Sequence, residues 1–112
     1  MKILTDKSFH EAIELCQEHD RYRVLIVTQY AKDHTSILDD LSKAGMSVVR
    51  SWGHPRASFP NGSIIEMVSI AANTRGRKAH LVLCQAEVYN VDSDIRYVLE
   101  SIEVVHRDFK LL

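Results

Sequence analysis

Apolar residues near the start of the chain recur with the period of an amphipathic helix, which predicts a helix over about residues 8–19. Four residues share its apolar face: Phe9, Ala12, Ile13 and Cys16. Ser8, with Glu11 three residues later, has the spacing of a capping box, in which side chains satisfy the free N–H groups of the first turn. Thr5 or Asp6 is the alternative cap.

A continuous apolar run follows over residues 23–28. Its β-branched side chains predict a strand that is buried on both faces, as the strands of parallel sheets are. A second amphipathic helix is predicted over about residues 35–44. Asp33 or Thr35 is placed to cap its start, and Gly45 stands just past its end, where glycine commonly terminates a helix.

The next part of the chain predicts shorter strands separated by turns. Residues 46–50, 63–69 and 80–84 each have the composition of a strand. Residues 51–62 predict a loop, because they contain both prolines of the chain and end in an Asn-Gly pair typical of tight turns. Residues 73–78 predict a polar turn before the last of these strands.

The C-terminal residues predict one more helix. Asp92 or Ser93 is placed to cap it, and residues 103–106 predict an edge strand after it. The helix has one apolar face: Ile95, Val98, Leu99 and Ile102.

The predicted order is helix, strand, helix, strand, strand, strand, helix. Buried strands that alternate with amphipathic helices predict an α/β fold, in which helices cover both faces of a layered, mostly parallel sheet. Within it, residues 46–85 are expected to add an antiparallel hairpin. A chain of 112 residues fits a single domain over residues 1–112.

Composition supports a folded globular protein, since 46% of the residues are hydrophobic and 26% are charged. Cys16 and Cys84 each lie in an apolar run and form no C-x-x-C motif, so we expect buried free thiols in a reducing compartment. No apolar stretch approaches the roughly 20 residues that span a bilayer, and residues 1–7 are too charged for a secretory signal. We therefore expect a cytoplasmic protein with no membrane partner.

Charge is unevenly distributed along the chain. Residues 50–80 contain five basic residues and a single acid, Glu66, although the formal net charge of the whole chain is −1. The only tryptophan, Trp52, lies in this segment. Such a composition suits the binding of nucleic acid, through base stacking and phosphate neutralisation, or of a protein partner; the alternative is a loop packed on the core with solvated charges. The candidate binding residues are Arg50, Trp52, His54, Arg56, Phe59, Arg75, Arg77 and Lys78.

A second set of residues has the chemistry of a nucleotide site. Lys7 and Ser8 open the first predicted helix, where a phosphate-binding loop places its lysine and its magnesium-binding hydroxyl. Asp6 replaces the glycine before the lysine and would repel phosphates, so an ordinary helix cap is the alternative. Gln85 and Glu87 follow the last buried strand, where nucleotide hydrolases carry magnesium-binding acids. ATP with magnesium is a cofactor only if this set binds nucleotide.

No other motif predicts catalysis or a metal site. The six histidines include no H-x-x-x-H pair, and the chain contains no G-x-S-x-G sequence. His10 and His19 are nine residues apart, which places them on opposite sides of the predicted helix. We therefore expect no metal and no catalytic residues, and no cofactor unless the nucleotide set binds ATP; whether the chain is an enzyme is left open, with a non-catalytic role favoured.

Taken in order, several segments resemble the ATPase core of phage terminase large subunits and related P-loop, helicase-type NTPases. They are Lys7-Ser8-Phe9-His10, Val24-Leu25-Ile26-Val27-Thr28, Asn61-Gly62-Ser63-Ile64-Ile65, Arg75-Gly76 and Leu81-Val82-Leu83-Cys84-Gln85-Ala86-Glu87. The resemblance covers most of the chain and implies a P-loop NTPase-like fold and the handling of viral DNA. The chain departs from the family at its glycine-free phosphate loop and at Cys84-Gln85, where the family has an Asp-Glu pair. These departures indicate a shortened, degenerate relative and argue against ATP hydrolysis.

Three functions follow from these observations. The first is a non-catalytic binding module that engages nucleic acid or a protein through residues 50–80. The second is a structural protein that associates with itself through sheet edges or the Trp52 loop. The third is a nucleotide-binding protein with a degenerate phosphate loop.

Overall fold

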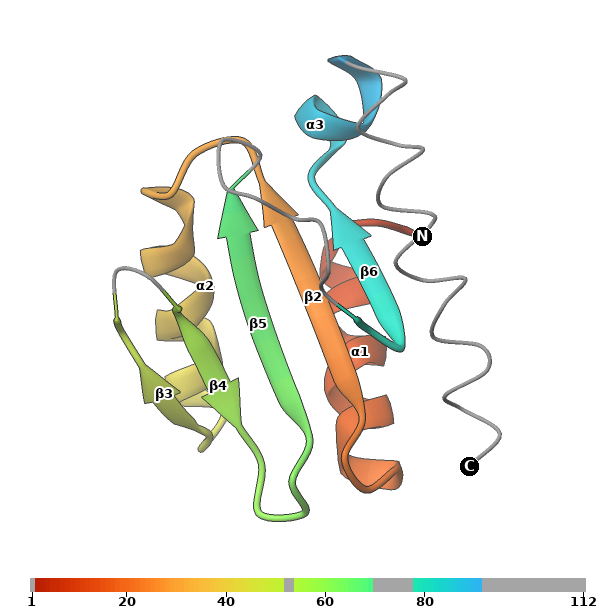
Figure 1. Ribbon diagram of the computed structural model, residues 1–112, viewed down its shortest axis with the longest axis vertical. Helices are drawn as coiled ribbons and strands as arrows, with labels where there is room; N and C mark the ends of the chain where they lie inside the picture. Colours follow the sequence, from red (N-terminus) through yellow and green to blue (C-terminus); the bar gives the residue numbers. More distant parts are fainter. Residues whose placement is uncertain (1, 52–53, 70–77, 92–112) are drawn as a thin grey trace.

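The computed structural model describes residues 2–51, 54–69 and 78–91. These residues form a six-stranded mixed sheet with the strand order β1-β6-β2-β5-β4-β3 (Figure 1). The strands are β1 (Lys2–Ile3), β2 (Arg23–Thr28), β3 (Ser47–Val49), β4 (Arg56–Ser58), β5 (Ile64–Ser69) and β6 (Leu81–Cys84). Strands β1, β6, β2 and β5 are parallel, whereas β4 runs antiparallel to both β5 and β3. The α/β fold and the mostly parallel sheet with an antiparallel addition are therefore confirmed.

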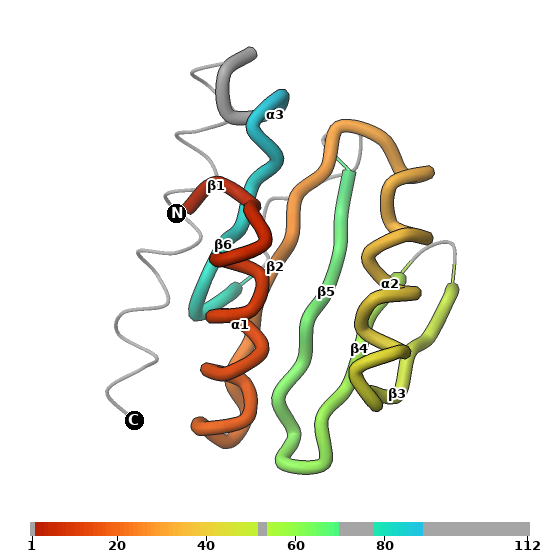
Figure 2. The backbone as a smooth tube through the Cα atoms, turned by 180° about the vertical axis from the view of Figure 1, so that it is seen from behind, coloured from red at the N-terminus to blue at the C-terminus, as the bar shows by residue number. Residues whose placement is uncertain are grey.

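Two helices, α1 (Asp6–Glu18) and α2 (Asp33–Lys43), lie on the same face of the sheet (Figures 1 and 2). Their placement follows from topology. The chain moves in one direction along the sheet from β1 to β2 and again from β2 to β3, and right-handed crossovers in one direction place their helices on one face. The C-terminal (carboxyl) ends of the four parallel strands lie along the same side of the sheet, which we call the carboxyl edge.

The sheet divides the buried side chains into two clusters, because successive residues of a strand point to opposite faces. On the helix side, Val24 and Ile26 of β2 and Ile65 and Met67 of β5 pack with residues of α1 and α2. The other face carries a second cluster: Leu25, Val27, Val68, Ala79, Val82, Cys84 and Val88. Val88 belongs to a short helix, α3 (Ala86–Val91), so α3 contacts the face opposite α1 and α2. The four inner positions of β2, residues 24–27, are therefore all apolar.

The helix caps differ from the sequence prediction. Thr5 is the N-cap of α1, and Ser8 is its capping-box partner, so the predicted pairing of Ser8 with Glu11 is wrong and the Thr5 alternative is right. The first turn begins two residues earlier than the apolar stripe indicates. Helix α2 follows Lys32 with no side-chain cap, so neither predicted cap residue serves there. Gly45 follows the C-cap of α2 with φ +91°, as the sequence predicts.

Three short elements escaped the sequence analysis. Strand β4 lies inside the segment predicted as a loop, β1 precedes the first helix, and α3 follows β6. The two strands have only two and three residues, which is too short for a hydrophobic period to appear. The helix and strand predicted beyond residue 91 lie outside the described residues. In the described part of the chain, no helix is long and apolar enough to cross a membrane.

Candidate functional site

The carboxyl edge brings the predicted nucleotide set together. Strand β1 pairs with β6, and the Leu4 N–H donates to the Cys84 carbonyl oxygen at 2.7 Å. Because the chain enters α1 directly after β1, Lys7 and Ser8 lie at the same sheet edge as Gln85. These residues are far apart in the sequence, and the pairing of β1 with β6 brings them to one edge of the sheet.

The Ser8 hydroxyl forms hydrogen bonds with backbone groups of the protein. It accepts from the Thr5 N–H at 2.8 Å and donates to the Ile3 carbonyl oxygen at 2.9 Å, and the residue is only 7% exposed. A hydroxyl that binds magnesium must face the ligand, whereas this one closes the first turn of α1. The geometry therefore matches the helix-cap interpretation, and Lys7 beside it stays exposed.

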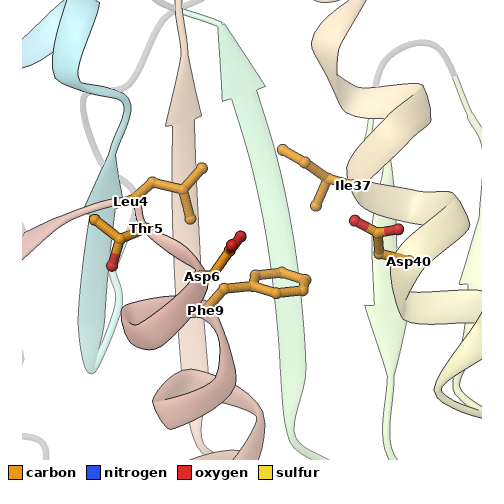
Figure 3. Close-up of a pocket in the computed structure, with 6 residues that line it drawn as sticks. All are labelled: Leu4, Thr5, Asp6, Phe9, Ile37 and Asp40. Carbon is orange, nitrogen blue, oxygen red and sulfur yellow. The ribbon is translucent and has the colours of Figure 1, made fainter.

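A pocket of about 170 Å³ lies between the start of α1 and α2 (Figure 3). Its lining consists of Leu4, Thr5, Asp6, Phe9, Ile37 and Asp40. Sites for drug-sized ligands typically measure about 300–1,000 Å³, so this pocket suits a group the size of one side chain. The carboxylates of Asp6 and Asp40 belong to the lining and would repel a phosphate.

Gln85 connects two strands across the carboxyl edge. Its Oε1 accepts from the Gln29 N–H at 2.8 Å, and its Nε2 donates to Asp33 Oδ2 at 3.4 Å. Gln29 follows β2 and Asp33 begins α2. The amide therefore fixes the β2–α2 connection to the end of β6. Glu87, which the sequence analysis grouped with Gln85, is exposed in the first turn of α3.

A buried polar pair lies next to this connection. His34 Nε2 and Thr28 Oγ1 are 2.8 Å apart, and Thr28 also donates to the Tyr30 carbonyl oxygen at 3.0 Å. His34 is 8% exposed and Thr28 is fully buried. Burial lowers the pKa of His34, against the opposing effects of a hydrogen bond to the Val68 backbone and the charge of Asp33. The neutral imidazole is therefore the form that the fold favours.

The sequence analysis missed the polar pair at this edge. The connection after β2 leads to α2 on one face, and the connection after β6 leads to α3, which contacts the other face. Open α/β sheets bind ligands at such a divergence, outside the carboxyl ends of the strands. Polar residues at the end of a buried strand and directly after it, such as Thr28 and Gln29, are the signal that could have identified it.

Part of the predicted basic set gathers on the face opposite α1 and α2. Glu66 Oε2 is 2.8 Å from His54 Nε2, and Glu66 Oε1 is 3.9 Å from the Arg23 guanidinium. The Arg56 guanidinium lies 3.2 Å from His54 Nδ1 and donates to the His54 carbonyl oxygen at 3.0 Å. We call Arg23, His54, Arg56 and Glu66 the Glu66 cluster. Arg23 is a member that the sequence analysis did not single out.

The other predicted binding residues are dispersed. Arg50 forms an exposed ion pair with Asp39 at 2.7 Å, and Phe59 is 8% exposed and belongs to the core. Phe59 thus takes the packing role that the sequence analysis held open. Lys78 is exposed and precedes β6, at the edge opposite the carboxyl edge. The remaining three residues lie outside the described part: Trp52, Arg75 and Arg77.

Metal and thiol chemistry are not supported by the described residues. Among them, no group of three or more histidine, cysteine, aspartate or glutamate side chains could hold a metal ion. Burial raises the pKa of Cys16 to about 12. Burial, aided by the charge of Glu87, raises the pKa of Cys84 to about 11. Both cysteines are buried and free, so they act as small apolar residues.

Comparison of this chain with protein-family models, with curated proteins and with solved structures finds no match.

Proposed function

We propose that this chain is a non-catalytic binding domain that holds nucleic acid on the face opposite α1 and α2. The observation that carries the proposal is the Glu66 cluster. Arg23 of β2 pairs with Glu66 on β5, and Arg56 of β4 connects to the same carboxylate through His54, although the two arginines are far apart in the sequence. The cluster would supply the positive charge, whereas Arg50 pairs with Asp39 of α2 on the helix side and is not part of this face.

The arrangement suits phosphate because the arginine positions are set by the sheet. Arg56 and Glu66 are register partners in β4 and β5, and Arg23 begins β2, the neighbour of β5. The Arg23 side chain keeps 52% of its surface exposed, so its guanidinium has free area for a phosphate oxygen.

A non-catalytic role agrees with the accessibility of the reactive groups. Among the described residues, Thr28 and His34 form a hydroxyl–imidazole contact of the kind that activates a nucleophile, and both are buried. Neither thiol is ionised near neutral pH, because burial holds both pKa values far above 7. The side chains that remain accessible around the Glu66 cluster bind charge and carry no activated nucleophile.

The test is a salt titration of binding to a fluorescein-labelled single-stranded oligonucleotide, followed by anisotropy. We expect the affinity to fall with salt, because each phosphate contact releases counterions. Arg23→Gln and Arg56→Gln should each weaken binding and lower the slope of log K against log salt by about 1. Lys43→Gln is the matched control, since it removes the same charge from the exposed last turn of α2.

Two results would overturn the proposal. One is the absence of binding by the wild-type protein at about 50 mM salt, where electrostatic contacts to nucleic acid are strong. The other is an equal loss of affinity in Lys43→Gln and in the two arginine variants, which would show a general charge effect. Binding of a protein in place of nucleic acid would then be the alternative.

Nucleotide binding at the carboxyl edge is a second candidate, and one observation favours it. The pairing of β1 with β6 brings the start of α1, which contains Lys7, to the same edge of the sheet as Gln85. Asp6 and the occupied Ser8 hydroxyl oppose it. Calorimetry with ATP and magnesium tests the candidate: heat that disappears in Lys7→Ala supports it, and no heat at millimolar nucleotide removes it.

A further inference from the structure

Three aromatic rings from separate parts of the chain form a stack at the edge opposite the carboxyl edge. The His19 and Tyr22 ring centroids are 5.6 Å apart with planes inclined by 29°, and those of Tyr22 and His80 are 4.7 Å apart and inclined by 18°. His19 is the C-cap of α1, Tyr22 precedes β2, and His80 precedes β6. We call these residues the aromatic stack; Tyr22 is its middle member.

Hydrogen bonds to the backbone hold the stack in place. The His19 carbonyl oxygen accepts from Ser63 Oγ at 2.6 Å and from Asn61 Nδ2 at 3.2 Å. The Tyr22 N–H donates to Ser63 Oγ at 3.0 Å. His80 Nδ1 accepts from the Arg23 N–H at 2.9 Å, and the His80 N–H donates to the Arg23 carbonyl oxygen at 2.7 Å. These bonds fix the backbone of His19 and Tyr22 and the ring of His80, so the backbone that carries the stack needs little reordering when a ligand binds.

The two ends of the stack differ in exposure. His19 is exposed, whereas Tyr22 and His80 are partly buried, and Tyr22 also packs against the core. Tyr22 stacks with both neighbours, and His19 is the exposed member of the three, so the His19 end is where the stack can be extended.

Basic residues lie within two positions of the stack residues in the sequence. Arg21, Arg23 and Lys78 are all exposed, and Arg21 has a left-handed backbone with φ 56°. Glu18 and Asp20 are exposed acids of the same turn, so positive charges exceed negative ones by one among these five residues.

We propose that the aromatic stack is a base-stacking site for single-stranded nucleic acid, in which an unpaired base lies on the His19 ring. Arg21 and Lys78 would contact the flanking phosphates. Every base has a π-face that can extend a stack of aromatic rings, whereas the bases inside a duplex have no free face. This inference rests on the proposed function and narrows its ligand to single strands.

The test compares His19→Ala with wild type in binding to a single-stranded oligonucleotide and to a hairpin duplex of the same length. We expect His19→Ala to weaken single-strand binding about ten-fold and to leave both duplex binding and the salt slope unchanged, since no phosphate contact is lost. His19→Phe restores an aromatic face and should restore single-strand affinity. Gln17→Ala, an exposed substitution on α1, is the control.

A second measurement follows the stacked base itself. An oligonucleotide that carries 2-aminopurine loses fluorescence when this base stacks on an aromatic ring. We expect quenching by wild type and by His19→Phe, and less quenching by His19→Ala at saturating protein. This readout reports stacking even if the Ala variant is less stable.

The outcomes separate the two proposals. Equal single-strand affinities for wild type and His19→Ala, with unchanged 2-aminopurine emission, overturn the stacking site; the proposed function then stands if Arg56→Gln still weakens binding. If wild type binds no oligonucleotide, both proposals fail. A failure of His19→Phe to restore affinity, despite a wild-type unfolding midpoint, also overturns the stacking site.

Discussion

The side-chain amide of Asn61 donates to the carbonyl oxygen of Cys16, 45 residues earlier in the chain, at 2.7 Å. The bond joins the β4–β5 turn to the last turn of α1, whose final carbonyls have no partners within the helix. The same amide reaches the His19 carbonyl oxygen, and Asn61 Oδ1 accepts from the Ser63 N–H at 3.0 Å. The sequence predicts Asn61 only as part of a turn, but its side chain also hydrogen-bonds free carbonyl groups at the C-terminal end of α1.

Asn61→Ala should destabilise the protein by about 1–2 kcal/mol, because the Cys16 carbonyl oxygen loses this side-chain partner within the fold. Urea unfolding followed by circular dichroism measures the change. Gln17→Ala, at an exposed position of the same helix, should leave the midpoint nearly unchanged. Equal midpoints for Asn61→Ala and wild type would show that the bond contributes no net stability.

Gly62→Ala should be more destabilising than Gly45→Ala. Both glycines have left-handed backbones, with φ +86° and φ +91°, so each substitution costs about 1–2 kcal/mol in backbone strain. A Cβ on Gly62 would also lie 3.3 Å from Arg21 Cγ, whereas a Cβ on Gly45 meets nothing within 4 Å. The excess cost at Gly62 should disappear in an Arg21→Ala background. Thermal unfolding of the four variants measures these differences, and an excess that persists without Arg21 would contradict the account.

Acidification should destabilise the fold through His34. Its pKa in the folded protein is lowered by burial, while in the unfolded chain it lies near 6.5, so between these values the unfolded chain binds more protons. The contribution of His34 to the free energy of unfolding is therefore fully present above about pH 6.5, and it is lost as the pH falls toward the folded pKa. His34→Gln removes the titration and should flatten the dependence of the free energy of unfolding on pH over this range. A variant with the same pH dependence as wild type would exclude His34 as its source.

Neither cysteine should react with a thiol reagent in the folded protein at pH 8. Burial keeps both thiols protonated, with pKa values of about 12 for Cys16 and about 11 for Cys84, and reagents attack the thiolate. Labelling with Ellman's reagent should be slow in buffer and complete in urea. Ser42→Cys places a thiol at an exposed position and should react at once in the folded state. Fast labelling of wild type would show that the core opens readily.

Long regular elements were predictable because their signal is local. The buried strand predicted over residues 23–28 coincides with β2, and α1 and α2 lie within two residues of the predicted starts and one residue of the predicted ends. Their side-chain periods record which face is buried. The short strand β4 shows no such hydrophobic period, because its three residues become a strand only by pairing with β3 and β5.

The candidate sites were predictable in part. Arg56 and His54 were found from the local excess of basic residues, whereas Arg23 joins them only because β2 pairs with β5 and thereby approaches Glu66. The aromatic stack could not be found from sequence, since its rings come from the end of one helix and the starts of two strands.

The sequence by itself determined an α/β sheet with buried central strands, two amphipathic helices and two thiols in apolar runs, because hydrophobic period and burial are properties of neighbouring residues. Only the tertiary structure decided the order of the strands, and with it which polar side chains meet. Asn61 reaches Cys16, and Gln85 reaches Gln29, through contacts between segments whose separation in sequence carries no information about distance in space.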